Sequence, residues 1–490
     1  MTADALMIQG TGSDVGKSVI VAALCRIARQ RGLRVAPFKP QNMSNNAAAC
    51  LDGGEIGRAQ ALQALACGID ANTDHNPVLL KPETDRVAQV VVHGKALSSM
   101  DAAHYMSSRQ SLLEPVMQSF SRLLANNDLV IVEGAGSPAE VNLRDRDIAN
   151  MGFARRADVP VCLLGDIERG GVIASLVGTR DILDPEDAAM ITGFIVNKFR
   201  GDPALFTDGV SFIESRTTWP CHGVIPWIPA MSRLPAEDAV SMGNSETDGS
   251  PSLRVVAPML SRMANFDDAD PLRLEPSVDF SFIPPGTPLP RDADLVILFG
   301  TKSTIGDLGF LRRQGWDHDI IAHARHGGRV LGICGGYQML GQSIDDPLGV
   351  DGEPGRVDGL GLLNIHTAMT AEKTVRPVSG HCANTGARAE GYEIHVGRTQ
   401  GPDCQRPLMK FDDRDEGAAS PDGRIRGTYI HGLLNHDAYR DAFLRELGAA
   451  PSAIAFSDTV SRSLDEIADA VAASVDIDAM FATARRPAVH

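Results

Sequence analysis

Short apolar runs alternate with longer helix-forming stretches along almost the whole chain, and this alternation constrains the fold more than any other feature. Such alternation predicts βαβ units, in which parallel strands form a sheet that helices cover. Strands are expected at ALMIQG, RVAPF, LVIVEG, VPVCLLGD and ITGFIVNKF, and then in a second series at LRVVAP, LVILFG, RVLGIC and IRGTYI. The sequence therefore predicts an α/β fold with two doubly wound, mostly parallel sheets.

The two series of strands are separated by the polar segment PAEDAVSMGNSETDGSPS, which is rich in small residues and typical of a linker. A chain of 490 residues is also too long for one ordinary hydrophobic core. We expect a first domain over residues 1–234, a linker over 235–252, a second domain over 253–449 and a C-terminal helical extension over 450–490.

The composition excludes several classes of protein. With 46 basic and 62 acidic residues the formal charge is −16, which argues against a sequence-independent nucleic-acid binder. The eight cysteines are scattered, without a Cys-x-x-Cys pair, so neither a disulfide framework nor a structural zinc site is expected. The N-terminus does not resemble a signal peptide, and no apolar run approaches the roughly 18–20 residues of a membrane span. These features predict a cytoplasmic protein without a membrane partner.

The first candidate site is the segment GTGSDVGKS, residues Gly10 to Ser18, between an expected strand and an expected helix. Its last three residues, Gly16, Lys17 and Ser18, match the end of a phosphate-binding loop, whose amides and helix N-terminus surround phosphates. In this role Lys17 would reach the β- and γ-phosphate oxygens, and Ser18 would hold Mg²⁺. The strict pattern has glycine where this chain has Thr11, so the loop counted from Gly10 is one residue longer.

Two further residues follow expected strands of the first half. Glu133 ends LVIVE and precedes a glycine turn, and Lys39 follows RVAPF. Ligands of open α/β sheets bind at the carboxyl ends of the strands. We therefore expect Glu133 to coordinate or orient Mg²⁺, and Lys39 to contact a substrate carboxylate or the transferred phosphoryl group.

The second candidate site is GICGGYQMLG, which places Cys334 between an expected strand and an expected helix. Small neighbours permit the strained turn of a nucleophile elbow, here with cysteine in place of serine. The N-terminus of the following helix would stabilise a thiolate. A thiolate nucleophile needs a proton-transfer partner: His431, at the end of IRGTYI, is the first candidate and His395, in GYEIHVGRT, the second.

Several long strings resemble the cobyric acid synthase family, and the variant phosphate loop also resembles dethiobiotin synthetase. These strings are KPQNMSNNA, GRAQALQA, NPVLLKP, EGAGSPAEVNLRDRDIANM, GDIERGGVIASLVGT and VNKFRGD. The resemblance implies a P-loop NTPase-like domain followed by a flavodoxin-like class I glutamine amidotransferase domain. It also implies a nucleotide site formed by Gly12, Ser13, Asp14, Val15, Gly16, Lys17, Ser18, Val19 and Asn197, and substrate or phosphoryl contacts from Lys39, Asn42, Ser44 and Asn45.

For the second half, the resemblance implies that Cys334 attacks the side-chain amide of glutamine and that His431 protonates the departing ammonia. The backbone amides of Gly335 and Gly300 would form the oxyanion hole. Many class I relatives have a glutamate two residues after the histidine, where this chain has Leu433. A Cys–His dyad is therefore expected, with His431 oriented by another part of the chain.

Together the two sites imply ATP-driven amidation with Mg²⁺ as the metal ion. By resemblance, the substrate is adenosylcobyrinic acid a,c-diamide, whose b, d, e and g carboxylates are amidated to give adenosylcobyric acid. Positive charge for this anionic substrate is expected from Arg144, Arg146, Arg169 and Lys198. The alternatives are a cobyrinic acid a,c-diamide synthase, a partition-type P-loop ATPase, and an amidotransferase scaffold that has lost its activity.

Overall fold

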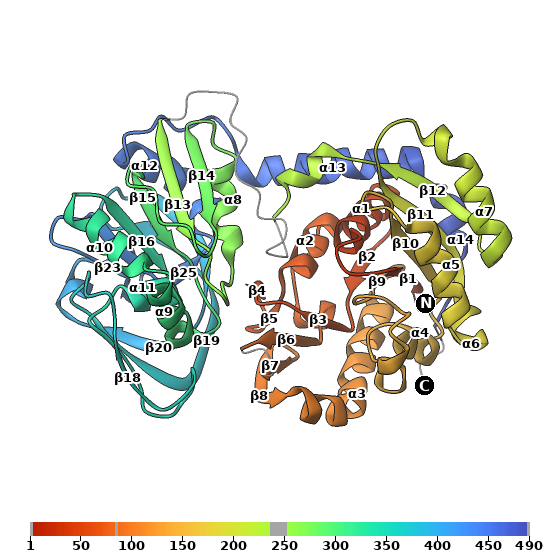
Figure 1. Ribbon diagram of the computed structural model, residues 1–490, viewed down its shortest axis with the longest axis horizontal. Helices are drawn as coiled ribbons and strands as arrows, with labels where there is room; N and C mark the ends of the chain where they lie inside the picture. Colours follow the sequence, from red (N-terminus) through yellow and green to blue (C-terminus); the bar gives the residue numbers. More distant parts are fainter. Residues whose placement is uncertain (1–2, 84–86, 236–251, 488–490) are drawn as a thin grey trace. The chain divides into compact units, whose positions relative to one another are not determined.

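The computed structural model describes residues 3–83, 87–235 and 252–487, and Figure 1 shows its helices and strands. Apart from Pro235 and Ser252, the expected linker lies outside the described residues. Contacts divide the chain into two compact units. Unit 1 comprises residues 1–43, 54–234 and 460–490, and unit 2 comprises residues 44–53 and 235–459.

The main sheet of unit 1 has six parallel strands in the order β12-β11-β10-β1-β9-β2. Its strands are β1 (Asp4–Gly10), β2 (Val35–Phe38), β9 (Leu129–Glu133), β10 (Val161–Asp166), β11 (Ile191–Phe199) and β12 (Cys221–Pro226). The central strands are almost entirely buried. Burial on both faces explains why these strands read as continuous apolar runs instead of alternating patterns.

Unit 1 also contains a small second sheet and most of the helices. The order of the small sheet is β3-β6-β7-β8, with β3 (Gln41–Met43), β6 (Val78–Pro82), β7 (Val87–Val92) and β8 (Lys95–Asp101). The helices are α1 (Lys17–Gln30), α2 (Arg58–Cys67), α3 (Ala102–Asn126), α4 (Met151–Ala157), α5 (Val172–Ile182), α6 (Pro185–Ala188), α7 (Thr207–Thr217) and α14 (Ile477–Ala482), together with most of α13 (Phe456–Ser474). Helices α1 and α2 pack on β2, and α5 packs on β10.

Unit 2 has its own six-stranded sheet, in the order β14-β13-β15-β16-β24-β23. The strands β13 (Leu253–Pro258), β14 (Val278–Ile283), β15 (Leu295–Leu298), β16 (Arg329–Ile333) and β24 (Ile425–Thr428) are parallel, and β23 (Ala418–Ala419) is antiparallel to β24. The helices are α8 (Asp270–Arg273), α9 (Thr304–Arg313), α10 (Trp316–Arg325), α11 (Gly335–Met339) and α12 (Asp437–Glu446).

A second, mostly antiparallel sheet of unit 2 lies outside the sequence-based prediction. Its central hairpin pairs β19 (His366–Cys382) with β20 (Arg388–Gln400), and its other strands are β17 (Ser343–Asp346), β18 (Gly355–Asp358), β21 (Met409–Lys410), β22 (Asp415–Glu416) and β25 (Ile430–His431). Much of the hairpin is exposed, so it lacks the apolar runs that mark the buried strands.

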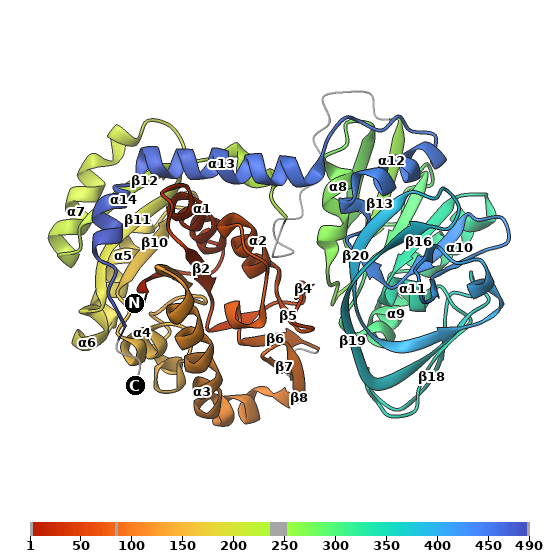
Figure 2. The ribbon, with the colours of Figure 1, turned by 180° about the vertical axis from the view of Figure 1, so that it is seen from behind.

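The predicted α/β class is confirmed, and each of the nine predicted strands coincides with a strand of a parallel sheet. The contacts nevertheless group the chain differently from the expected division in two places. Residues 460–490 join unit 1, where α13 runs past α1 (Figure 2). Arg26 of α1 forms an ion pair with Asp465 of α13 at 2.7 Å. Residues 44–53, including β4 (Ala47–Ala49), join unit 2, where β4 packs against β19 and β20.

Candidate active sites

The loop after β1 folds tightly around the ammonium group of Lys17. Its Nζ donates hydrogen bonds to the carbonyl oxygens of Gly12 at 2.8 Å and Gly136 at 3.1 Å. A methyl group on Gly10 would lie 2.6 Å from Val15 Cγ2 and 2.9 Å from this Nζ, so glycine is needed there. Gly16, at φ 98°, caps α1 in the left-handed region. The one-residue-longer loop therefore still presents a lysine and a helix N-terminus.

Glu133, at the end of β9, collects four side-chain donors. Its Oε1 accepts hydrogen bonds from Ser18 Oγ and Lys39 Nζ, each at 2.8 Å, and its Oε2 accepts from Gln60 Nε2 at 3.3 Å and Gln63 Nε2 at 2.5 Å. Burial alone would raise the pKa of Glu133, but the charge of Lys39 and these hydrogen bonds outweigh it and lower the pKa. The structure thus brings Ser18, Glu133 and Lys39 together around a carboxylate that is ionised at neutral pH.

Asn197, on β11, supports the loop from the other side. Its Nδ2 donates to the carbonyl oxygen of Val15 at 2.9 Å, while its Oδ1 is buried without a hydrogen-bond partner among the described residues. The neighbouring Lys198 donates to the carbonyl oxygen of Asp14 and pairs with Asp166 Oδ2 at 2.8 Å. Asn197 therefore anchors the phosphate loop at Val15 and keeps a buried amide oxygen without a partner among the described residues.

The other residues predicted to contact the substrate in the first half form hydrogen bonds or ion pairs within the protein, or lie on its surface. Asn42 donates to Gln60 Oε1 at 2.9 Å. Ser44 and Asn45 lie in unit 2, where Ser44 Oγ accepts from the amide of Asn46 at 3.1 Å. Arg144 is paired with the buried Asp187, whereas Arg146 and Arg169 are exposed on the surface.

In unit 2, Cys334 occupies a strained turn between β16 and α11. Its φ of 54° and ψ of −112° are unusual for a residue with a side chain. Its amide donates to the carbonyl oxygen of Thr428 at 2.8 Å. A methyl group on Gly336 would lie 2.0 Å from the carbonyl oxygen of Leu298, so the turn tolerates only glycine there. This is the geometry of a nucleophile elbow.

His431 lies beside this thiol and interacts with it electrostatically, while Cys334 Sγ itself donates a hydrogen bond to the carbonyl oxygen of Ile394 at 3.5 Å. Gly300 lies next to both side chains, because a methyl group built on it would be 3.0 Å from His431 Cε1 and 3.5 Å from Cys334 Cβ. A methyl group on Gly335 would in turn lie 3.2 Å from the amide nitrogen of Thr301. The structure therefore brings together Cys334, His431 and the two glycines predicted for the oxyanion hole.

The group that orients His431 is Asp268, which the sequence analysis missed. Its Oδ2 lies 2.7 Å from His431 Nδ1, and its Oδ1 accepts from the amide of Gly432 at 2.6 Å. Burial would lower the pKa of His431, but the charge and hydrogen bond of Asp268, with the Cys334 contact, raise it to about 10. The dyad thus has a third member, drawn from the turn Phe266–Ala269.

His395, the second candidate, has different surroundings. Its ring stacks on that of Tyr429, with centroids 3.8 Å apart, and burial lowers its pKa to about 4. A neutral imidazole held in this stack has no carboxylate partner comparable to Asp268 in the contacts described here. The geometry therefore favours His431 as the proton-transfer partner of Cys334.

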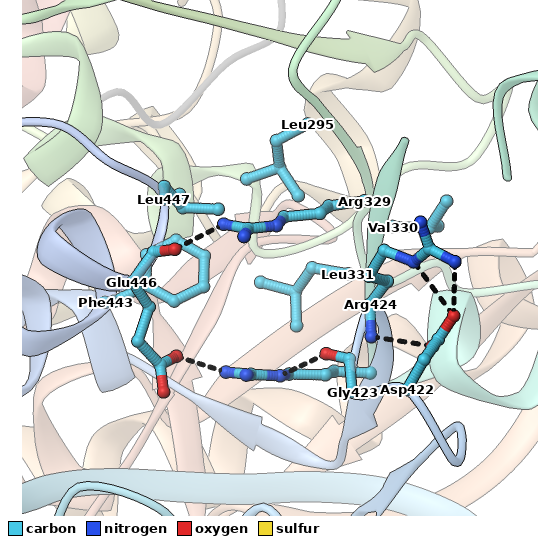
Figure 3. A pocket seen from close by; sticks show the side chains of 11 residues that line it. Leu295, Arg329, Val330, Leu331, Asp422, Gly423, Arg424, Phe443, Glu446 and Leu447 are labelled. Atoms are coloured by element: carbon cyan, nitrogen blue, oxygen red, sulfur yellow. Dashed lines mark hydrogen bonds and ion pairs between the residues drawn. The ribbon is translucent and has the colours of Figure 1, made fainter. Parts of the chain in front are cut away.

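Unit 2 contains a cavity of about 260 Å³, whose lining residues Figure 3 shows. It lies at the opposite end of the parallel strands from Cys334. The cavity is lined at the start of β16 and β24 by Arg329 and Arg426, whereas the thiol follows the end of β16. Arg426 pairs with Glu446 at 2.5 Å, and Arg329 donates to the backbone carbonyl of the same residue. We do not assign glutamine chemistry to this cavity, because the nucleophile lies elsewhere.

Comparison with known proteins gives matches to both halves. Residues 6–241 match the CobQ/CobB/MinD/ParA nucleotide binding domain, and residues 254–439 match the CobB/CobQ-like glutamine amidotransferase domain. A cobyric acid synthase of Hyphomonas neptunium is 62% identical over 99% of both chains. The chain belongs to the cobyric acid synthase family. A second relative of that name, from Paracoccus denitrificans, is 60% identical over 98% of this chain and 100% of its own.

The family assignment rests on these full-length relatives. The solved structure of PurLQS from Thermotoga maritima covers 44% of this chain and 97% of its own at 17% identity, with a TM-score of 0.30, and we draw no argument from that likeness. In the ranges that the structure describes, no helix is both long and apolar enough to cross a lipid bilayer. The nucleotide-binding match includes Lys17 and Glu133, and the amidotransferase match includes Asp268, Cys334 and His431.

Proposed function

We propose that the chain uses ATP and glutamine to convert adenosylcobyrinic acid a,c-diamide to adenosylcobyric acid in the cytoplasm, by amidating the b, d, e and g carboxylates. The observation that carries the proposal is one chain holding both a phosphate loop around Lys17 and a thiol–imidazole–carboxylate set at Cys334. The substrate rests on the names of the full-length relatives.

In the glutaminase reaction, Cys334 reacts as a thiolate whose proton has passed to His431. Its Sγ attacks the side-chain carbonyl carbon of glutamine, and the amides of Gly300 and Gly335 stabilise the oxyanion. His431, charged at neutral pH because of Asp268, donates a proton to the departing ammonia. Water then attacks the thioester, with His431 accepting its proton, so glutamate leaves and the thiolate–imidazolium pair is restored. Each turn thus releases one ammonia.

In the synthetase reaction, an oxygen of the substrate carboxylate attacks the γ-phosphorus of ATP, giving an acyl phosphate and ADP. Lys17 neutralises charge on the transferred group from within the loop. Lys39, 2.8 Å from Glu133, is the second cation at this edge of the sheet. Ammonia then attacks the acyl carbon, phosphate leaves, and the amide remains.

The donor set around Ser18 and Glu133 fits Mg²⁺, a hard cation that takes a hydroxyl, one or two carboxylates and phosphate oxygens. In the described part of the chain, no cluster of three or more His, Cys, Asp or Glu side chains is arranged to hold a metal. Mg²⁺ held by Ser18 and Glu133 would supply charge neutralisation for the phosphates. Glu133 would have to exchange one of its present donors for the ion.

The test is incubation of the purified protein with ATP, Mg²⁺, glutamine and adenosylcobyrinic acid a,c-diamide, followed by mass spectrometry of the corrinoid. Replacement of OH by NH₂ lowers the mass by about one unit, so four successive losses are expected. Glutamine hydrolysis with an unchanged corrinoid would leave the thiol chemistry intact but reject the proposed substrate.

A further inference from the structure

A short segment from the N-terminal half of the chain is built into the glutaminase centre. Residues 44–53 lie between β3 and β5 (Glu55–Gly57), two strands of unit 1, yet their contacts place them in unit 2. Within this segment Asn46 is 1% exposed and Ala47 is fully buried. The segment thus packs as part of the unit that holds Cys334.

Asn265 holds this segment with every hydrogen-bonding group of its amide. Its Nδ2 donates to the carbonyl oxygen of Ala47 at 2.7 Å and to the hydroxyl of Tyr392 at 2.9 Å, and its Oδ1 accepts from the amide of Ala47 at 3.4 Å. In return, Asn46 Oδ1 accepts from the amide of Asn265 at 2.6 Å. Because these groups are buried, separating them would leave several polar atoms unsatisfied.

Asn265 has a left-handed backbone conformation. Its φ of 53° lies in a region that asparagine adopts more readily than other residues with a side chain, and its surroundings select that conformation over the commoner ones. The four hydrogen bonds to Asn46, Ala47 and Tyr392 supply that constraint. The backbone path after Asn265 therefore depends on the segment at Asn46.

Three contacts connect Asn265 to the catalytic groups. The amide of the preceding Ala264 donates to the carbonyl oxygen of Gly300 at 2.8 Å, next to the expected oxyanion hole. The carbonyl oxygen of Asn265 accepts from the amide of Asp268 at 3.2 Å. The ring of Tyr392 stacks on His431, with centroids 5.5 Å apart and planes inclined by 22°. A shift of Asn265 would therefore reach both the oxyanion hole and the imidazole.

We propose that residues 44–53 are a positioning element of the glutaminase centre, through which Asn46 and Asn265 set His431 and Gly300 and make glutamine hydrolysis responsive to ligands of unit 1. Both ends of the segment continue covalently into unit 1, at Met43 and Gly54. If ligand binding moves either end of the segment, it also alters the hydrogen bonds that Asn46 and Ala47 form with Asn265. This inference rests on the proposed function, because it requires a working glutaminase.

The test compares Asn46→Ala and Asn265→Ala with Asn364→Ala, a matched change at an exposed asparagine of unit 2. Glutamine hydrolysis is measured with and without ATP and the corrinoid substrate, and ammonium-driven amidation is measured in parallel. We expect the first two variants to lose at least about tenfold in kcat for hydrolysis, with little change in KM, and to lose the response to ATP and corrinoid. Ammonium-driven amidation is expected to stay within about twofold of wild type.

Tyr392→Phe provides a milder variant in case the alanine substitutions unfold unit 2. It removes the hydroxyl that accepts from Asn265 but keeps the ring on His431, so we expect a partial loss of kcat and a weakened response to ligands. Hydrolysis in all three variants that matches Asn364→Ala would overturn the inference, as would a wild-type rate indifferent to ATP and corrinoid. A wild type without glutamine hydrolysis would instead reject the proposed function.

Discussion

At the scale of single residues, the thiol of Cys334 is separable from the synthetase chemistry. The change Cys334→Ala removes the nucleophile but leaves Lys17 and Glu133 untouched, so glutamine hydrolysis should fall by on the order of 10³-fold or more. Amidation with added ammonium should continue. The measurements are glutamate release and corrinoid mass for the same preparation. Loss of both activities in a folded variant would mean that Cys334 also serves the synthetase.

Asp268 controls the charge of His431, and this gives a prediction about pH. In Asp268→Asn the amide oxygen still accepts from Gly432, but the negative charge that raises the pKa of His431 to about 10 is gone. Burial of the imidazole then lowers that pKa with only the Cys334 contact to oppose it. The imidazolium exists only below the pKa, so the alkaline limb of the glutaminase kcat/KM profile should move to lower pH.

The control for this shift is Asp412→Asn, an exposed carboxylate of the same unit. Its profile should follow wild type, whereas hydrolysis by Asp268→Asn near pH 8 should fall by about 10²-fold or more. An Asp268→Asn profile that superimposes on wild type between pH 6 and 11 would rule out a role for Asp268 in the charge of His431.

Lys17 gives the complementary prediction for the first site. In Lys17→Ala the cation inside the loop is lost, so ATP-dependent amidation should fall by on the order of 10²-fold or more with either glutamine or ammonium as donor. Wild-type rates of corrinoid amidation in this variant would reject the loop as the phosphoryl-transfer site. The chain offers Lys410, an exposed lysine of β21, for a matched control.

At the scale of elements, the elbow depends on how closely α11 approaches β15. In Gly336→Ala the added methyl group would lie 2.0 Å from the carbonyl oxygen of Leu298, so helix or strand must shift. We expect the free energy of unfolding of unit 2 to fall by about 1–3 kcal/mol, with loss of glutaminase activity. Thermal unfolding and glutamate release measure the two effects.

The matched control is Gly309→Ala in α9, where the nearest atom to the new methyl group is Arg313 Nη1, at 3.4 Å. Because the new methyl group has space and alanine favours a helix over glycine, the free energy of unfolding should rise by about 0.5–1 kcal/mol. If both substitutions behaved alike, close packing at the elbow would not be the cause.

At the scale of the whole molecule, the last part of the chain completes the unit in which the chain begins. The face of α13 formed by Val460, Leu464, Ile467, Ala468 and Val471 is buried. Leu464→Ala should therefore lower the free energy of unfolding of unit 1 by about 2–5 kcal/mol. Leu205→Ala, at a side chain 83% exposed, should leave it almost unchanged. Heat inactivation of ammonium-driven amidation provides the measurement. Equal inactivation temperatures would show that α13 contributes no stability to unit 1.

The sequence alone determined those features of the protein that depend on a few consecutive residues. Buried parallel strands are continuous apolar runs, and helices follow them with their own period, so the α/β class and the parallel strands of the two six-stranded sheets, other than β12 and β14, followed directly. The phosphate loop and the elbow at Cys334 are equally local, because each needs small residues at fixed offsets along a few consecutive positions. The long β19–β20 hairpin was not predicted, because much of its surface is exposed and it therefore lacks a continuous apolar run.

Only the tertiary structure decided what distant segments do together. Asp268 reaches His431 across 163 positions, and Asn46 reaches Asn265 across 219, so neither pairing leaves a signal within a local window. The acidic run around Asp268 resembles an ordinary solvated turn, and Leu433, two residues after His431, offers no carboxylate nearby in the sequence. These pairings follow from burial, because a charge or amide removed from water is stable only where the fold places a hydrogen-bonding or charged partner beside it.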